Sequence, residues 1–215
     1  MMYLSKSEIV YQHIREGIES GRYRPGDRFS AQEIARELGV SRTPVNEAMK
    51  KLSEYGLIRI LPNVGYEVIS LGVRDIREIM EIECLLERQA ISWMQLPPAP
   101  ERLAELRSLA RGILEAGERQ DRREYNRLTN LFHQRFIELT DSRVLSEIYQ
   151  KSRHFSGWDD ARIIELTGEL DQVNREHLEL LDALERQDRD RALAIMQAHS
   201  DRCWLLVERS LGKDR

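Results

Sequence analysis

The sequence predicts a mostly α-helical chain in two parts: three short helices with a β-hairpin, then an all-α antiparallel helical bundle. Apolar residues recur at helical spacing along most of the 215 residues, and one alternating stretch within residues 57–69 gives the strand signal. With 12 glycines and 6 prolines the chain has too few turn residues for a β-sandwich, and its charged fraction of 33% fits long solvated helix faces.

Length and composition exclude several classes of protein. A chain of 215 residues favours one or two domains, too few for a large multidomain enzyme. Its uncharged stretches fall well short of the ~18 apolar residues of a membrane span, and its first residues lack the apolar core of a signal peptide. Cys84 and Cys203 form neither a disulfide framework nor a CxxC site. We expect a soluble, cytoplasmic protein with no membrane partner.

The charge is distributed unevenly between the two parts. The net charge is −4, but residues 1–70 hold ten basic and nine acidic side chains, whereas residues 71–215 hold 23 and 28. The overall acidity therefore belongs to the second part, and a basic surface on the first part stays open. We place the domain boundary between residues 1–71 and 72–215.

In the first part, helix caps and turn residues predict where each element begins and ends. A helix over residues 7–20 stops at Gly21, and residues 22–28 form a turn around Pro25-Gly26. Ser30 caps a second helix with Glu33 as its capping-box partner. Ser41 caps a third, which has Pro44 in its first turn and stops near Gly56, and residues 57–61 and 66–69 then form a hairpin.

This order of elements is the winged helix-turn-helix arrangement, in which the later helix enters the DNA major groove. Arg42, Asn46 and Lys50 share one face of the third helix. Arginine reads guanine and asparagine reads adenine in the major groove, while lysines meet phosphates. Ser41 and the helix N-terminus offer N–H groups to a phosphate. An ordinary amphipathic helix with a solvated face is the alternative, and the ordered caps, turn and wing argue against it.

At these residues the chain resembles the GntR family of bacterial transcription regulators. The matching text is Arg22-Tyr-Arg-Pro-Gly-Asp-Arg, Glu33-Ile-Ala-Arg-Glu-Leu-Gly-Val-Ser-Arg-Thr-Pro-Val, Glu47-Ala-Met-Lys-Lys-Leu and Glu54-Tyr-Gly-Leu-Ile. The resemblance keeps Arg42, Thr43 and the wing-tip Gly65 as DNA-binding residues. Gln32 and Asn46 stand where family members usually carry DNA-contacting arginines, so it implies an operator that differs from the common family site.

In the second part, helices are predicted over residues 74–94, 101–118, 122–140, 143–154, 160–186 and 188–210. Three of them carry a histidine on their apolar face. His133 lies with Phe132 and Phe136, His177 with Val173 and Leu181, and His199 with Met196 and Cys203. A single such histidine is usually a hydrogen-bonded core residue. Three in one bundle favour convergence on a metal or an anionic ligand, since imidazole is a good ligand for zinc or nickel.

The last helices resemble the FCD ligand-sensing domain of the FadR subfamily, through Glu176-His177, Asp182-Ala-Leu, Asp188, Ala192 and Met196-Gln-Ala-His199, preceded by Phe132-His133. The resemblance implies a divalent metal held by His133, His177 and His199, with a small carboxylate effector. Zinc is the first choice, since imidazole ligands and an incomplete shell suit its four-coordinate sites, and nickel is the second. Thr129, beside Asn130, stands where the family has an aspartate ligand, and Glu83 stands where it has an arginine. We therefore assign Thr129, Asn130 and Glu83 to the effector pocket.

These observations favour a ligand-responsive transcription regulator, homodimeric because a two-fold protein matches a palindromic operator. A metal-dependent enzyme with a DNA-binding-like appendage is the alternative. Against it, the sequence positions no general base as HExxH does, and Glu176 points about 100° away from His177 around its helix. A third hypothesis is an architectural DNA binder whose helical part only dimerises.

Overall fold

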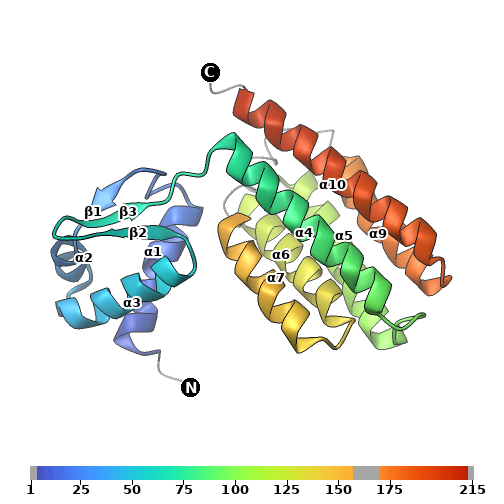
Figure 1. Cartoon of the computed structure of the whole chain (residues 1–215), viewed down its shortest axis with the longest axis horizontal. Helices are drawn as coiled ribbons and strands as arrows, with labels where there is room; N and C mark the ends of the chain where they lie inside the picture. The colour runs from blue at the N-terminus through green and yellow to red at the C-terminus, as the bar shows by residue number, and fades with distance from the viewer. Residues whose placement is uncertain (1–3, 157–169, 213–215) are drawn as a thin grey trace. The chain divides into compact units, whose positions relative to one another are not determined.

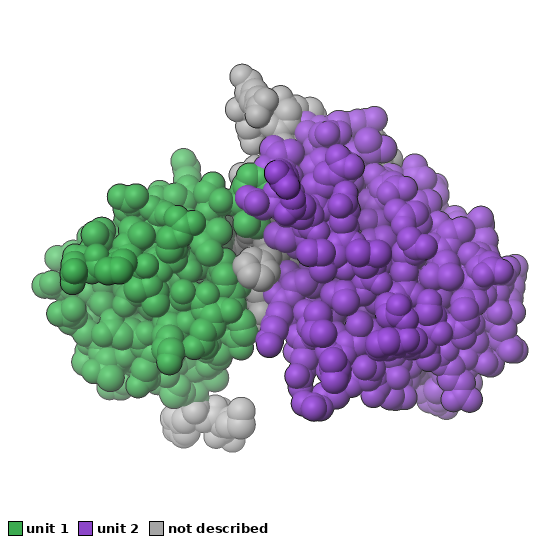
Figure 2. Space-filling model, viewed as in Figure 1, with its two compact units in different colours: residues 1–72 green, residues 73–215 purple. Residues whose placement is uncertain are grey.

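The structure, a computed structural model, describes residues 4–156 and 170–212. The chain divides into two compact units, Met1–Gly72 and Val73–Arg215 (Figure 2). Unit 1 holds the strands of the described residues, and unit 2 is helical (Figure 1). The predicted fold class, a winged helix-turn-helix followed by a helical domain, is confirmed.

Unit 1 has three helices and a small antiparallel sheet. The helices are α1 (Lys6–Glu19), α2 (Ala31–Leu38) and α3 (Arg42–Glu54); the strands are β1 (Arg28–Phe29), β2 (Ile58–Leu61) and β3 (Gly65–Val68). The strand order is β1-β3-β2, and the hairpin pairs Ile58 with Val68 and Leu61 with Gly65. Side chains from α1 and α3, including Ile14, Met49 and Leu52, are fully buried and hold the helices together.

Strand β1 was not predicted from the sequence, which indicated only a turn over residues 22–28. Arg28 pairs with Glu67 and Phe29 pairs with Tyr66 across β3. Two residues are too few to show an alternating pattern, so the strand exists only because β3 offers a free edge. The Arg28 guanidinium also donates to the Glu67 carboxylate at 2.7 Å, which joins the two strands through their side chains.

The predicted helix caps have mixed outcomes. Ser30 and Glu33 form the full capping box, each side chain bonding the other's backbone N–H. Gly39 ends α2 in the left-handed conformation, with φ 63°. Ser41 stands at the N-cap of α3, but its side chain makes no capping hydrogen bond. Capping by the Ser41 side chain was therefore wrong, and the exposed hydroxyl is left for another partner.

The described helices of unit 2 are α4 (Val73–Trp93), α5 (Pro100–Glu118), α6 (Arg122–Glu138), α7 (Arg143–Ser156), α9 (Leu170–Glu185) and α10 (Arg189–Gly212). They agree with the predicted helices within a few residues at each described end. The predicted helix over residues 160–186 is described from Leu170 onward, and residues 160–169 lie outside the described residues.

The helices of unit 2 run alongside one another, with α4 beside α10 and α5 beside α6 (Figure 1). Phe132 and Phe136 of α6 and Tyr149 of α7 are among the largest fully buried side chains. Between α4, α6, α7, α9 and α10 the packing leaves an internal cavity. No helix in the described part of the chain is long and apolar enough to cross a membrane.

Candidate metal centre and nucleic-acid interface

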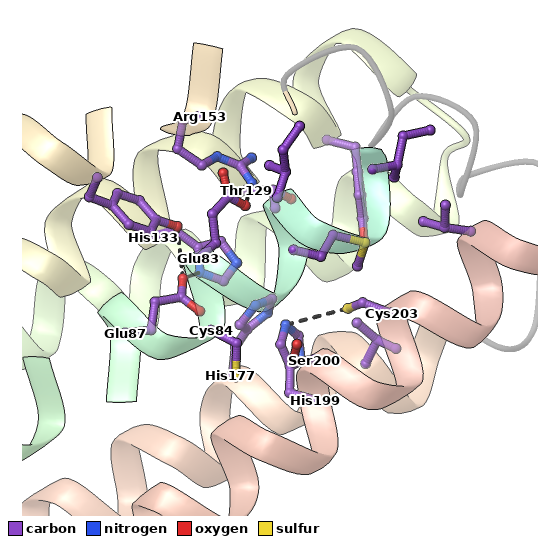
Figure 3. A pocket seen from close by; sticks show the side chains of 17 residues that line it. Glu83, Cys84, Glu87, Thr129, His133, Arg153, His177, His199, Ser200 and Cys203 are labelled. Atoms are coloured by element: carbon purple, nitrogen blue, oxygen red, sulfur yellow. Dashed lines mark hydrogen bonds and ion pairs between the residues drawn. The ribbon is translucent and has the colours of Figure 1, made fainter. Parts of the chain in front are cut away.

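Three histidines from three helices meet in the cavity of unit 2. His133 comes from α6, His177 from α9 and His199 from α10, and each is less than one-tenth exposed. One ring nitrogen from each lies within 4.8 Å of the other two. Figure 3 shows the rings turned toward one another. The structure therefore brings together the three residues that shared a core phase in the sequence.

Glu87 holds the first of these rings. Its Oε1 lies 2.6 Å from Nδ1 of His133 and accepts a hydrogen bond from the Tyr149 hydroxyl at 2.8 Å. Burial alone would raise the pKa of Glu87, but the contacts with His133 and Tyr149 outweigh it and lower that pKa. The lowered pKa keeps the Glu87 carboxylate ionised. Because Glu87 contacts Nδ1 of His133, the other ring nitrogen, Nε2, points away from Glu87.

Glu176 holds the third ring in the same way. Its Oε2 lies 3.2 Å from Nδ1 of His199, and its Oε1 accepts from Nε of Arg202 at 2.8 Å. Burial opposes ionisation, yet the bonds from His199 and Arg202 lower the pKa of Glu176. The turn of about 100° between Glu176 and His177 along α9 is what carries this carboxylate to α10.

His177 lies beside the other two histidines and is hydrogen-bonded to neither Glu87 nor Glu176. It is 2% exposed, and neither ring nitrogen has a hydrogen-bond partner among the described residues. Burial, with the neighbouring His199 and His133, lowers its pKa well below the ordinary value. Burying a neutral imidazole without a hydrogen bond to either nitrogen costs free energy of folding, unless a ligand or ion bonds one of the nitrogens.

His199 behaves in the opposite way. Burial would lower its pKa, but the Cys203 sulfur and the Glu176 carboxylate outweigh that effect and raise the pKa well above the ordinary value. A metal that binds this imidazole therefore competes with a proton that the raised pKa favours.

The donor set fits a divalent transition metal. Metal-bound histidines almost always direct their second nitrogen at a carboxylate or carbonyl, as His133 and His199 do here. The buried, unpartnered nitrogens of His177 supply a third donor. Imidazole ligands of this kind suit zinc and nickel. The sequence pattern assigned no role to Glu87 or Glu176, because periodicity does not say which helix faces which.

The cavity is about 80 Å³, several times the space that one water molecule needs. Thr129 and Glu83, both assigned to an effector pocket, line it, and the buried Thr129 hydroxyl has no partner among the described residues. Glu83 lies 3.1 Å from Nη1 of Arg153, which also lines the cavity. Asn130 is not among the residues that line the cavity. It contacts the lining residue Arg153, whose Nε donates to its Oδ1 at 3.0 Å. Nothing in the sequence pattern indicated Arg153.

In unit 1, the expected DNA-reading face of α3 is exposed. Arg42, Thr43, Asn46 and Lys50 are all open to solvent, as is Gln32 on α2. Within the described part of the chain, Lys50 makes one long ion pair, 3.9 Å to Glu54 between two well-exposed side chains, and such a pair contributes little to stability. The neighbouring Lys51 donates to the Glu8 carboxylate at 3.0 Å and packs over the Tyr11 ring. Its side chain is therefore engaged within unit 1.

Gly65 has a structural role of its own. Its φ is 137°, and a Cβ atom at this position would lie 2.6 Å from the Phe29 carbonyl oxygen. The close approach of β1 therefore requires glycine here, whether or not the wing touches DNA. The exposed tip of the wing is formed by its neighbours, and Val64 is 64% exposed.

Comparison with known families decides what kind of protein this is. Residues 6–68 match the family model of bacterial regulatory proteins of the gntR family, and residues 78–202 match the FCD domain. The chain belongs to the GntR family of bacterial regulators. The FCD match spans more than half of the chain and lies in Val73–Arg215, whereas the gntR match lies in Met1–Gly72, so the two matches together cover both units.

Relatives of this GntR-family chain are described as HTH-type transcriptional regulators. It is 39% identical over 131 residues to an HTH-type transcriptional regulator of Agrobacterium vitis, covering 60% of this chain and 77% of that protein. It is 27% identical to the regulator YdhC of Bacillus subtilis, covering 88% and 85%. The solved structure of McbR from E. coli has the same fold, with a TM-score of 0.81 at 23% identity over 96% of this chain and 99% of that one. These relatives are transcription regulators, not enzymes.

Proposed function

We propose that this GntR-family regulator senses a small organic acid in its FCD domain, with the help of a divalent metal, and changes its operator binding in response. DNA binding belongs to residues 1–71, and effector binding and dimerisation belong to residues 72–215. The FadR subfamily is the part of the family that this two-domain pattern fits.

The single observation that carries the metal site is the meeting of His133, His177 and His199 within 4.8 Å, with the buried His177 lacking any hydrogen-bond partner among the described residues. Zinc is the first choice and nickel the second, because both accept imidazole ligands. The metal would supply a positive charge for an anionic oxygen of the effector. Thr129 and Arg153 line the same cavity and offer a hydroxyl and a cation to the rest of that molecule.

The effector acts only if it binds the DNA-competent and DNA-incompetent forms with different affinity. Five helices line the cavity, among them α4, the first helix after the DNA-binding unit, and α10. A ligand that draws these helices together favours one packing of unit 2 over another. We infer that the packing of α4 transmits the signal toward residues 1–71.

The regulator works as a homodimer in this proposal. Helices α4 and α10 lie side by side and expose apolar side chains, among them Ile82 and Leu85 on α4 and Leu205 on α10, each at least half exposed. Apolar residues grouped on neighbouring helices mark an association surface. A two-fold dimer would present two α3 helices to two half-sites of a palindromic operator.

The test combines metal analysis with DNA binding. Purified protein equilibrated with zinc or nickel is expected to retain about one ion per chain, and His177→Ala to retain none. His177→Ala should bind the operator normally without effector and fail to respond to candidate carboxylates. Metal content of zero in the unsubstituted protein, or an unchanged effector response in His177→Ala, would contradict the proposal.

A further inference from the structure

The three histidines leave the metal with an incomplete set of protein ligands. Thr129, at the family's aspartate position, offers a neutral hydroxyl, which is a weak ligand for a borderline cation. Glu87 contacts His133 and Tyr149 through the same oxygen, and Glu83 pairs with Arg153. Both of these carboxylates thus have other partners. Another potential donor in the cavity is the sulfur of Cys203.

Cys203 lies one helical turn after His199 on α10, on the same face. Its Sγ is 3.6 Å from Nε2 of His199 and lines the same cavity (Figure 3). Since Glu176 contacts Nδ1 of His199, Nε2 is the nitrogen left for a metal. The sulfur is therefore next to the ligand atom of His199, although it lies outside the group of His133, His177 and His199 ligand atoms that are all within 4.8 Å of one another.

The separation of the two atoms matches a shared ion. With a Zn–N bond of about 2.0–2.1 Å and a Zn–S bond of about 2.3 Å, two ligands at a tetrahedral angle lie roughly 3.5 Å apart. Sγ and Nε2 are 3.6 Å apart. The unpartnered, 2% exposed His177 lines the same cavity and independently indicates that an electrophile belongs there.

We propose that Cys203 is the fourth protein ligand, so that this regulator holds its metal through three imidazoles and one thiolate. The inference rests on the metal site of the proposed function and names a fourth protein ligand for it, so that an anionic oxygen of the effector would add to the ion as a fifth ligand. On binding, the thiol loses its proton to solvent and the sulfur bonds the ion. A thiolate shifts the preference toward zinc, cobalt and cadmium and away from hard cations such as manganese.

Cys84 provides a matched control. It also lines the cavity, but its Sγ donates to Oε1 of Gln197 at 3.9 Å, and burial raises the pKa of its thiol. Both cysteines are free and both lie in the helical unit. The variants Cys203→Ser and Cys84→Ser therefore remove the same group from two sides of one cavity.

Cobalt(II) is the probe, because a cobalt–thiolate bond gives an intense near-ultraviolet charge-transfer band that imidazole ligands do not give. The intact protein and Cys84→Ser should show the band at one equivalent of cobalt, and Cys203→Ser should lose it. Zinc affinity of Cys203→Ser should fall by more than about tenfold, the effect that even a lost outer-shell partner produces.

The outcomes separate this inference from the proposed function. Cobalt bound at one equivalent without the band overturns the Cys203 ligand and leaves the three-histidine site standing, whereas no cobalt uptake overturns both. A band lost in Cys84→Ser but kept in Cys203→Ser overturns it as well. If Cys203→Ser does not fold, thiol labelling of the intact protein decides: zinc should protect Cys203 from a thiol reagent, and unchanged labelling overturns the proposal.

Discussion

The Tyr66 hydroxyl, on the wing, donates a hydrogen bond of 2.9 Å to Oδ1 of Asn46 on α3. This contact engages the carbonyl oxygen of the asparagine amide and leaves its NH₂ group for another partner. Asparagine reads adenine with both its donor and its acceptor. If Asn46 reads a base, as we propose, a wing residue therefore decides how much of its amide is available.

Tyr66→Phe should alter base preference at one position of each half-site. Removing the hydroxyl frees Oδ1 of Asn46, and operator affinity should change by about 0.5–1.5 kcal/mol, the net value of one hydrogen bond. Selection of sites from random DNA measures the preference. In an Asn46→Ala background the same change should have no effect, and an equal effect there would show that Tyr66 acts independently of Asn46.

Arg42→Ala and Lys50→Ala should fail in different ways. Both side chains are exposed on α3. If Arg42 reads a base, its loss costs about 1–3 kcal/mol on the operator and little on unrelated DNA. Lys50→Ala should weaken all sequences alike and reduce the salt slope by about 1. Binding titrations at several salt concentrations separate the two, and normal operator binding by Arg42→Ala would remove it from the reading face.

Gly65→Ala should destabilise the winged domain by about 1–3 kcal/mol, because an alanine there has an unfavourable φ and a Cβ against the Phe29 carbonyl. Gly21→Ala is the matched control: Gly21 also has positive φ, 75°, but nothing lies within 4 Å of its Cβ position. Thermal unfolding of the full chain measures both variants. Equal losses would show that φ alone, without the approach of β1, accounts for the glycine.

Zinc affinity should rise as the pH rises above about 6.5. The pKa of His199 is raised by Cys203 and Glu176, so the stability from its proton is present below pH ~6.5 and is lost as the pH rises through the higher folded value. Zinc must displace that proton, whereas the lowered pKa of His177 means that it brings none at neutral pH. Calorimetry in buffers of different ionisation enthalpy counts the protons released.

Glu176→Gln is the check on this pH dependence. It removes the carboxylate that helps to hold the His199 proton, so fewer protons should be released per zinc at pH 7.5. Its zinc affinity should also fall about 10–100-fold, as for other lost outer-shell partners. An unchanged proton count would show that Glu176 does not control the ionisation of His199.

The sequence by itself determined the elements and their buried faces. Periodicity gave the described helices of both units, and the Ser30/Glu33 box fixed the start of α2, because these signals are local in the chain. The same periodicity put His133, His177 and His199, with Cys203, on apolar faces. It could not tell a shared site from three separate core histidines, because phase on a helix does not specify the opposing helix.

Tertiary structure decided the rest. Strand β1 exists because β3 presents an edge to Arg28 and Phe29, and Gly65 is required because that strand approaches it. In unit 2, only packing shows that Glu87 and Glu176 each orient one imidazole while His177 has no partner among the described residues. Such contacts join residues far apart in the sequence, and their energy depends on burial and on distances of a few ångströms, which no local pattern encodes.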